Sequence, residues 1–451
     1  MSKIQTLLFS IMMMAVSLSG CLDSEDNNTE EQFEDIFNSS DQQKRITPQF
    51  FELNGVTYFA ISSSMNLENI GIYQTDGTED GTELIWEPTG AEMGDIFVLQ
   101  SRFLFQVGLE LWSSDGTSLG TEMIADFSTS AEFLRIVSWD TGHVGLFVTH
   151  VHHSTSPNSQ QGSASLWISD STTAGTNEVF QYQEIDSSFY ADSSNGLLYF
   201  VANDSQSGNE LWMSDGTTQG TGIFYEMASG SEGASFEFVY ATSQNVFWST
   251  FSESVLSWEY RASNLATGTT ELIYSNPNPA TIHQHFIVGN NVYFVDLNQN
   301  DESQLYLSDG TASGTVMIHQ FASLVLDVQH AWTIGSEIFF NIREQGTLGS
   351  IWELDSSNQL SSFGTYYGSG WAVTQNLLIY FSTSADGIAG CSATPSGGGA
   401  NGCDGDIFTT DGTLSGTNLL LDTNADTRHI SIHSGILYFA QEHSIHAYTL
   451  L

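Results

Sequence analysis

The chain has 451 residues, with 8 Lys and Arg against 53 Asp and Glu, and its formal net charge is −45. This excess of anionic side chains argues against binding to nucleic acid or to an acidic membrane surface, because both require compensating cations on the protein. Only Lys3 and Lys44 are lysines. An acidic surface with so few lysines suits a protein exposed to a saline environment, where salt screens the repulsion between its charges, and the alternative explanation is a surface that binds cations.

Residues 1–21 have the features of an export signal. Lys3 supplies a positive start, and the apolar core around Ile11–Val16 is too short to span a bilayer comfortably. Leu18-Ser19-Gly20-Cys21 resembles a lipobox, which predicts cleavage before Cys21 and a lipid on its sulfur. We therefore expect an exported protein, lipid-anchored to the cell envelope at the outer membrane or the cell surface. The alternative is an ordinary signal peptide with an incidental cysteine.

Residues 22–45 are polar and acidic and contain few apolar anchors. Such a composition buries too little surface to offset the entropy lost on ordering, so it predicts a flexible tether. The alternative is that Phe33, Ile36 and Phe37 dock on the following domain as a short helix.

Residues 46–451 are dominated by a repeat whose clearest copy is Glu210-Leu211-Trp212-Met213-Ser214-Asp215-Gly216-Thr217-Thr218-Gln219-Gly220-Thr221. Its Asp recurs at Asp76, Asp115, Asp170, Asp215, Asp309 and Asp411, with two degenerate copies centred on Ser263 and Asp355. The period is about 48 residues, in the range of solenoids, propellers and arrays. Asp-Gly is typical of turns, so the motif Asp is predicted to form the turn and not to bind a metal ion.

Each repeat is predicted to contain four short strands. An aromatic residue stands three positions before the motif Asp, and we place it in the strand that enters the turn. The positions are Tyr73, Trp112, Trp167, Trp212, Tyr260, Tyr306, Trp352 and Phe408. Upstream runs end in paired large residues such as Tyr58-Phe59 and Tyr199-Phe200, and shorter runs such as 236–239 supply one more strand.

These units predict an all-β protein, a β-propeller of four-stranded antiparallel blades that forms one domain. Nine strands end in a pair of large residues, but only eight motif turns are found, so the number of blades could be eight or nine. Eight blades with an appended hairpin is the commoner geometry and is favoured. In a nine-bladed ring, a segment near Lys44–Gln49 would supply the last strand.

The chain resembles the ELWxxDGT repeat family of exported proteins, from about residue 49 to the C-terminus. The motif is most complete around Asp115, Asp215 and Asp309, and it degenerates at 263–265 and 355–357. The resemblance implies a β-propeller-like fold on a surface or secreted protein, and it implies no catalytic activity.

Two connections are longer than the repeat requires, and both join the second and third strands of a blade. The first follows His150-Val151-His152-His153, where two imidazoles could bind a metal ion, although solvated polar residues are the simpler interpretation; His283 and His285 repeat the spacing. The second contains Cys391 and Cys403, which are predicted to form a disulfide in an oxidising compartment. Two free thiols are the alternative.

One loop resembles a calcium site. Asp296, Asn298, Asn300 and Glu302 place oxygen ligands at alternate positions, so calcium is a candidate cofactor. The loop lacks the glycine and the final glutamate of a helical calcium loop, and ordinary turn residues are the alternative.

Two catalytic motifs that we sought do not occur, since neither a phosphate loop nor a His-Glu-x-x-His sequence is present. We therefore expect a binding or scaffold module for protein or neutral glycan, most simply a monomer. The competing hypothesis is a polysaccharide-active enzyme, a hydrolase or lyase with acidic residues at the mouth of the central channel.

Overall fold

The computed structural model describes residues 33–38, 46, 48–61, 70–89, 92–128, 131–150, 163–183, 190–204, 206–227, 234–252, 255–278, 284–345, 350–365, 371–374, 378–382, 406–411, 416–421, 427–441 and 444–450. Residues 33–451 form one compact unit; residues 1–32 form another, which lies outside these ranges. Every regular element in the described ranges is a β-strand, and no helix there is long and apolar enough to cross a membrane.

The strands group in chain order into four-stranded antiparallel sheets, which we number as blades. Blades 1 to 3 contain β2 (Pro48–Leu53), β3 (Val56–Ile61), β4 (Gly71–Thr75) and β5 (Glu83–Trp86); β6 (Met93–Val98), β7 (Phe103–Val107), β8 (Glu110–Ser114) and β9 (Glu122–Asp126); and β10 (Ala131–Asp140), β11 (His143–His150), β12 (Ser163–Ser169) and β13 (Asn177–Gln183).

Blades 4 to 6 contain β14 (Ala191–Ser194), β15 (Leu197–Asn203), β16 (Asn209–Ser214) and β17 (Gly222–Tyr225); β18 (Ser235–Ala241), β19 (Asn245–Ser252), β20 (Ser257–Asn264) and β21 (Thr269–Asn276); and β22 (Gln284–Val288), β23 (Asn291–Leu297), β24 (Ser303–Ser308) and β25 (Val316–Gln320). Blades 3 and 4 are joined into one larger sheet by a single residue pair, Gln183 with Asn203.

Blades 7 to 9 contain β26 (Val325–Ile334), β27 (Glu337–Glu344), β28 (Ser350–Leu354) and β29 (Leu360–Thr365); β30 (Trp371–Val373), β31 (Leu378–Ser382), β32 (Asp406–Thr410) and β33 (Asn418–Leu421); and β34 (Thr427–His433), β35 (Ile436–Gln441), β36 (Ser444–Thr449) and β1 (Glu34–Asn38).

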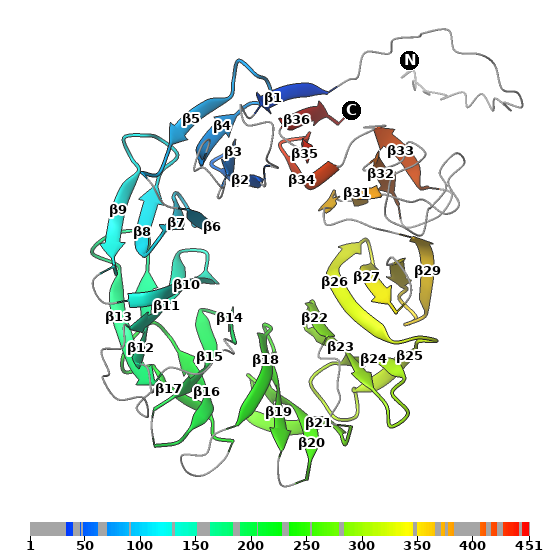
Figure 1. Cartoon of the computed structure of the whole chain (residues 1–451). Helices are drawn as coiled ribbons and strands as arrows, with labels where there is room; N and C mark the ends of the chain where they lie inside the picture. The colour runs from blue at the N-terminus through cyan, green and yellow to red at the C-terminus, as the bar shows by residue number, and fades with distance from the viewer. Residues whose placement is uncertain are drawn as a thin grey trace, which may run out of the picture. The chain divides into compact units, whose positions relative to one another are not determined.

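The blades follow one another around a closed ring (Figure 1). Nine apolar clusters hold it together, and each cluster takes its residues from two neighbouring blades, including blades 9 and 1. Most blades therefore bury both faces of their central strands, which is why runs such as Val56–Ile61 are apolar at nearly every position. The predicted all-β propeller of four-stranded antiparallel blades is confirmed.

The count of blades in the described chain is nine, above the roughly four to eight that are typical of propellers. Eight blades, the favoured count, is not what the structure contains, and the closing strand is not the segment near Lys44–Gln49. Instead β1 pairs with β36, Glu34 opposite Ala447 and Asn38 opposite Ser444.

This pairing also corrects the predicted tether, because Glu34–Asn38 belongs to the propeller. The three apolar residues decide it, although Ile36 and Phe37 lie in a strand and not a helix, and Phe33 directly precedes that strand. Ile36 is 2% exposed in the cluster between blades 9 and 1, and Phe37 packs against the ring of Tyr73. Phe33 packs edge-on against Phe439. Burying these side chains offsets the ordering entropy of the strand.

The repeated aromatic packs against the preceding blade, opposite a large residue of the second strand; for example, Phe59 stacks on Tyr73 and Phe294 on Tyr306. The fifth copy departs from this rule, and its register differs from the sequence alignment by one residue. Trp248 pairs with Arg261, so Arg261 occupies the aromatic position and Asn264 the position of the motif Asp.

A β-bulge supports this register, because in blades 1 to 8 the bulge between the third and fourth strands directly precedes the aromatic position. It lies between Ile72 and Tyr73 in blade 1 and between Tyr260 and Arg261 in blade 5. Successive residues on a strand point to opposite faces, so Tyr260 packs against blade 6 and not blade 4.

Antiparallel pairing gives the ring two distinct edges. The turn edge carries the connections from first to second strand, such as 54–55, and the motif turns, such as 115–121. The loop edge carries the connections from second to third strand, such as 108–109, and the crossovers between blades. Both enlarged connections, 151–162 and 383–405, join strands at the loop edge and lie outside the described residues.

We predict that Ile36→Ala destabilises the propeller by about 2–5 kcal/mol, the usual cost of truncating a buried isoleucine. The reason is that Ile36 anchors the strand that closes the ring. Urea unfolding monitored by tryptophan fluorescence measures the loss. Glu34→Ala, at an exposed position of the same strand, is the control and should change the free energy of unfolding by less than about 0.5 kcal/mol. Equal, small effects of both substitutions would contradict the role of β1.

Candidate functional site

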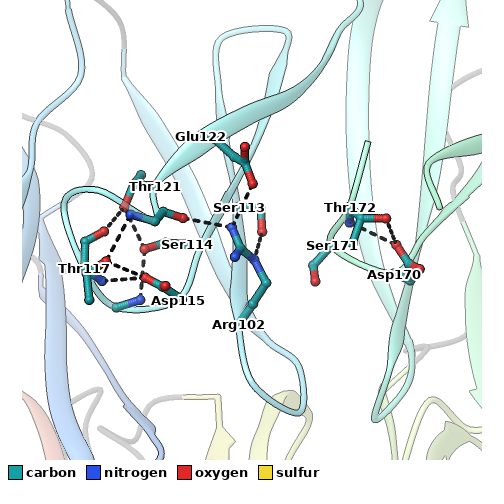
Figure 2. A network of polar contacts seen from close by, with 12 residues as sticks. Arg102, Ser113, Ser114, Asp115, Thr117, Thr121, Glu122, Asp170, Ser171 and Thr172 are labelled. Atoms are coloured by element: carbon teal, nitrogen blue, oxygen red, sulfur yellow. Dashed lines mark hydrogen bonds and ion pairs between the residues drawn. The ribbon is translucent and has the colours of Figure 1, made fainter. Parts of the chain in front are cut away.

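The motif turn is a closed network of hydrogen bonds, shown for blade 2 in Figure 2. Asp115 Oδ1 accepts from the backbone N–H and the hydroxyl of Thr117, at 2.9 and 2.7 Å. Thr117 Oγ1 accepts from the N–H of Gly120 at 3.0 Å, and the carbonyl of Thr117 accepts from the hydroxyl of Thr121 at 2.7 Å. Ser114 Oγ bonds to Thr121 Oγ1 at 2.7 Å and so ties the two ends together.

The same bonds recur around the ring. The motif Asp accepts both bonds from the residue two positions later in five copies: Asp76, Asp115, Asp170, Asp215 and Asp309. In the sixth copy, residues 412–415, which follow Asp411, lie outside the described residues. In the two degenerate copies, Asn264 Oδ1 accepts from the N–H of Thr267, and Asp355 Oδ1 from the N–H and hydroxyl of Ser357. The turn therefore survives where the motif has degenerated.

Two glycines of the motif are favoured by geometry, although Ser171 takes the place of the first one in the third copy, also at positive φ. A Cβ on Gly120 would lie 2.1 Å from Asp115 Oδ1, closer than any real contact. The corresponding distance is 1.9–2.1 Å in all six complete copies. The glycine after the Asp has positive φ, for example +90° at Gly116, where a Cβ would also lie 2.3 Å from the hydroxyl oxygen of Tyr58 in the preceding blade. The motif thus shapes a turn and fits it against its neighbour.

The turn carboxylates engage their own backbone. The hydroxyl of Thr117 and, more weakly, the guanidinium of Arg102 hold the pKa of Asp115 below its ordinary value. Arg102 in turn donates to Ser113 Oγ at 2.6 Å, to the carbonyl of Gly120 at 2.8 Å and to Glu122 at 3.3 Å (Figure 2). Arg102, which is not part of the motif, thus stabilises the turn at the turn edge.

We predict that Gly220→Ala destabilises the propeller by about 2 kcal/mol, because the added methyl displaces the Asp215 carboxylate from its bonds. Gly222→Ala is the matched control, since a Cβ there meets nothing within 4 Å. Chemical unfolding of both variants tests the prediction. A stability for Gly220→Ala equal to that of the control would show that the close approach carries no energetic weight.

A buried polar cluster lies between blades 5 and 6. Asp296 is 0% exposed, and its Oδ1 accepts from the N–H of Leu297 at 2.8 Å. Burial raises the pKa of Asp296 to about 6, although the N–H of Leu297, the amide of Asn276 and the hydroxyl of Tyr260 partly oppose the shift. Within the described chain, Asp296 Oδ2 makes no hydrogen bond of ordinary geometry.

Further polar groups surround Asp296 in this blade contact. Tyr274 donates to Tyr306 at 3.3 Å, and burial raises the pKa of Tyr274. The first strand of each blade lies toward the centre of the ring in Figure 1, and we call it the inner strand. Glu237 lies on β18, the inner strand of blade 5, and burial raises the pKa of Glu237 as well. Asp296 itself is enclosed, so it is a buried acid without access for a large ligand.

The four predicted calcium ligands do not form one site. Asp296 is sealed inside the blade contact, whereas the other three occupy the loop after β23. Asn298 Oδ1 accepts from the N–H groups of Asn300 and Glu302, and its amide donates to Glu302 at 2.7 Å. The alternation of the strand turns Asp296 inward, and the loop residues bind one another, which corrects this prediction. Among the described residues, no three His, Cys, Asp or Glu side chains are placed to hold a metal ion.

We predict that Asp296→Asn removes a pH-dependent loss of stability. The native pKa lies above the ordinary 3.8, so the native state favours the protonated acid. The favourable contribution of protonated Asp296 to the free energy of unfolding is therefore fully present below pH ~4 and is lost as pH rises toward 6. Above pH 6 the free energy of unfolding is lower by roughly 3 kcal/mol. Urea unfolding from pH 4 to 8 should show this slope in the unaltered protein and not in the variant.

Asp95→Asn, which replaces an exposed carboxyl of an inner strand, is the control for this pH series and should keep the slope of the unaltered protein. The same slope in all three proteins would contradict the assignment.

The other predicted site residues are dispersed or lie outside the described residues. Cys21, Cys391, Cys403, His152 and His283 are in the second group. His150 bonds to Ser165 at 2.8 Å, and His285 packs against Phe238 with 4.4 Å between ring centroids. The one described histidine of each pair thus contacts a neighbouring side chain, and its partner lies outside the described residues, so neither pair can be assigned as a metal site.

Sequence reasoning did not foresee a set of polar bridges between the inner strands. Gln49 exchanges two hydrogen bonds with the backbone of Ile96 in the next blade, at 3.2 and 2.9 Å. Asp192 Oδ2 accepts from the N–H of Ala241 at 2.8 Å, and burial raises the pKa of Asp192. Gln49 offered a signal, as a polar residue in a largely apolar strand, whereas Asp192 lies in the polar strand Ala191–Ser194 and offered none.

No family model matches the sequence, and no curated protein matches it. Among solved structures, the chain is similar to an oligogalacturonate lyase from Vibrio parahaemolyticus, with 12% identity, a TM-score of 0.42, and coverage of 74% of this chain and 96% of that one. It is also similar to a prolyl endopeptidase, with 10% identity, a TM-score of 0.45, and coverage of 76% and 55%. A puromycin hydrolase has 12% identity, a TM-score of 0.41, and coverage of 75% and 59%. The chain thus spans little more than half of the last two proteins, and at these scores the likenesses carry no argument about activity.

Proposed function

We propose that the protein is a lipid-anchored, surface-exposed propeller that binds a protein or a neutral glycan at its loop edge. The observation that carries the proposal is the placement of the two enlarged connections. Between second and third strands, the other blades use two to nine residues, whereas blade 3 uses 12 and blade 8 uses 23. Function on repeat folds concentrates where insertions do.

The positions of these blades favour a large partner. Blades 3 and 8 are separated by five steps around the ring in one direction and four in the other, so their loops start on opposite sides of the axis. A ligand that contacts both loops must reach across the ring. A protein surface or an extended glycan can do so, whereas a small molecule cannot.

Charge and export restrict the partner further. With a net charge of −45, the chain repels polyanions, which favours neutral or cationic partners over nucleic acid or acidic polysaccharide. The lipobox-like Leu18–Cys21 and the resemblance to the exported ELWxxDGT repeat family support a position at the cell envelope.

An enzyme acting on polysaccharide is the second candidate, because two carboxyls with raised pKa lie on neighbouring inner strands. They are Asp192 on β14 and Glu237 on β18, and burial raises the pKa of each. A raised carboxyl pKa is a property of general acids in glycoside cleavage.

Loop exchange tests the proposal. We predict that replacing residues 151–162 with the five-residue connection 298–302 weakens binding to a protein or neutral polysaccharide at least about tenfold, a loss of ~1.4 kcal/mol. Co-sedimentation with insoluble α- and β-glucans and mannan, and cross-linking to proteins of the cell surface, measure the effect. Replacing 345–349 with the same segment is the control, because it keeps the loop length of blade 7.

The assay also separates the two candidates. Release of new reducing ends or unsaturated sugars, abolished in Asp192→Asn or Glu237→Gln, would establish the enzyme instead. Binding that is unaffected by the blade 3 exchange and by an equivalent exchange in blade 8 would refute the loop edge as the binding surface.

A further inference from the structure

The chain enters the propeller at the turn edge. In blade 9, β36 runs from the 442–443 connection at the loop edge to the turn edge, where the N–H of Leu450 donates to the carbonyl of Gly435 at 3.0 Å. β1 is antiparallel to β36, with Asn38 opposite Ser444 and Glu34 opposite Ala447. Glu34 therefore lies toward the turn edge, so the described part of the chain begins, with Phe33, at that edge.

This entry point is held in place by specific contacts. Asp35 Oδ1 bonds to His446 Nδ1 at 2.6 Å, and Phe33 packs against the same imidazole with 5.1 Å between ring centroids. At the other end of the strand, the hydroxyl of Ser444 donates to Asn38 Oδ1. The strand cannot pivot around blade 9 without breaking these contacts.

The covalent distance to the proposed lipid is short. Eleven residues, 22–32, separate Cys21 from Phe33. At 3.3–3.6 Å per residue they span at most about 40 Å in any conformation. A blade strand of six residues, such as β3, is itself roughly 20 Å long, so the two edges of the ring stand about that far apart.

We infer that the turn edge faces the membrane and the loop edge, with both enlarged connections, faces away from it. The inference rests on the proposed lipid at Cys21. To bring the loop edge to the bilayer, the segment 22–32 would have to start at the turn edge and run past the full height of blade 9, which uses about half of its greatest reach even when it is fully extended. With the turn edge toward the membrane, the same segment reaches the bilayer directly. The loop edge is then the surface that a partner outside the cell meets.

Energy transfer to the membrane tests this orientation in the full-length, lipidated protein. A donor dye is attached through p-azidophenylalanine at Ala266 on the turn edge, or at Val255 on the loop edge of the same blade; both positions are exposed. The protein is bound to phosphatidylcholine vesicles that carry an acceptor on the lipid headgroup. Transfer should be more efficient from 266 than from 255, because the two sites differ by about 20 Å in height. Equal transfer, or more from 255, overturns the inference.

Two further variants separate the orientation from the anchor. Cys21→Ser should not bind the vesicles; if it binds them as the lipidated protein does, the lipid anchor itself is wrong, whatever the dye reports. Inserting a 20-residue Gly/Ser segment after Leu22 should reduce the difference between 266 and 255, because a longer connection lets the ring tilt. A difference that persists unchanged would show that tether length does not set the orientation, and would overturn the argument.

Discussion

The structure depends on one contact that six of the nine described blades share: a motif carboxylate lies against the residue five positions later, where only glycine fits. Because Asp115 lies on Gly120 and accepts from Thr117, the third and fourth strands of the blade leave the turn at a fixed angle. The glycine after the Asp then lets the turn lie against the preceding blade, as Gly116 does against Tyr58. One short motif therefore sets both the geometry within a blade and the fit between blades, and its repetition builds a ring.

Closing that ring requires a different kind of contact. Each blade contact forms between segments near in sequence, whereas the last joins β1 to β36 across about 410 residues, and such a closure carries a larger entropic cost. It needs compensating burial, which Ile36 and Phe33 supply. In the ninth blade His446 occupies the position of the repeated aromatic, stacks on Phe439 and bonds to Asp35, so a single residue serves both the repeat and the closure.

The sequence was sufficient for the fold class, the four-stranded unit and the turns, because period, paired aromatics and Asp-Gly all act locally. It misled where the answer depended on pairing. Tyr260 satisfies the aromatic spacing, but the hydrogen bond between Ser263 and Thr270 corresponds to the bond between Ser114 and Thr121 of blade 2. The true register of the fifth copy is therefore shifted by one residue, and Asn264 forms the turn. β1 was missed because acidic composition outweighed three apolar residues. Asp296 was assigned to a loop by its neighbours in sequence, while strand alternation buried it.

The two edges of the ring are constrained very differently, and this difference bears on function. At the turn edge, a side chain in place of the second glycine of a complete motif would displace the motif carboxylate, and one in place of the glycine after the Asp would meet the preceding blade. At the loop edge, the strand ends are already fixed by pairing, so a connection can grow from two residues to 23 without altering the blade contacts. Variation in the length of the connections is therefore concentrated at the loop edge. Under the proposed function, a lipid-anchored segment that precedes β1 would leave this variable surface free for the partner, so anchoring and binding would not compete for the same side of the protein.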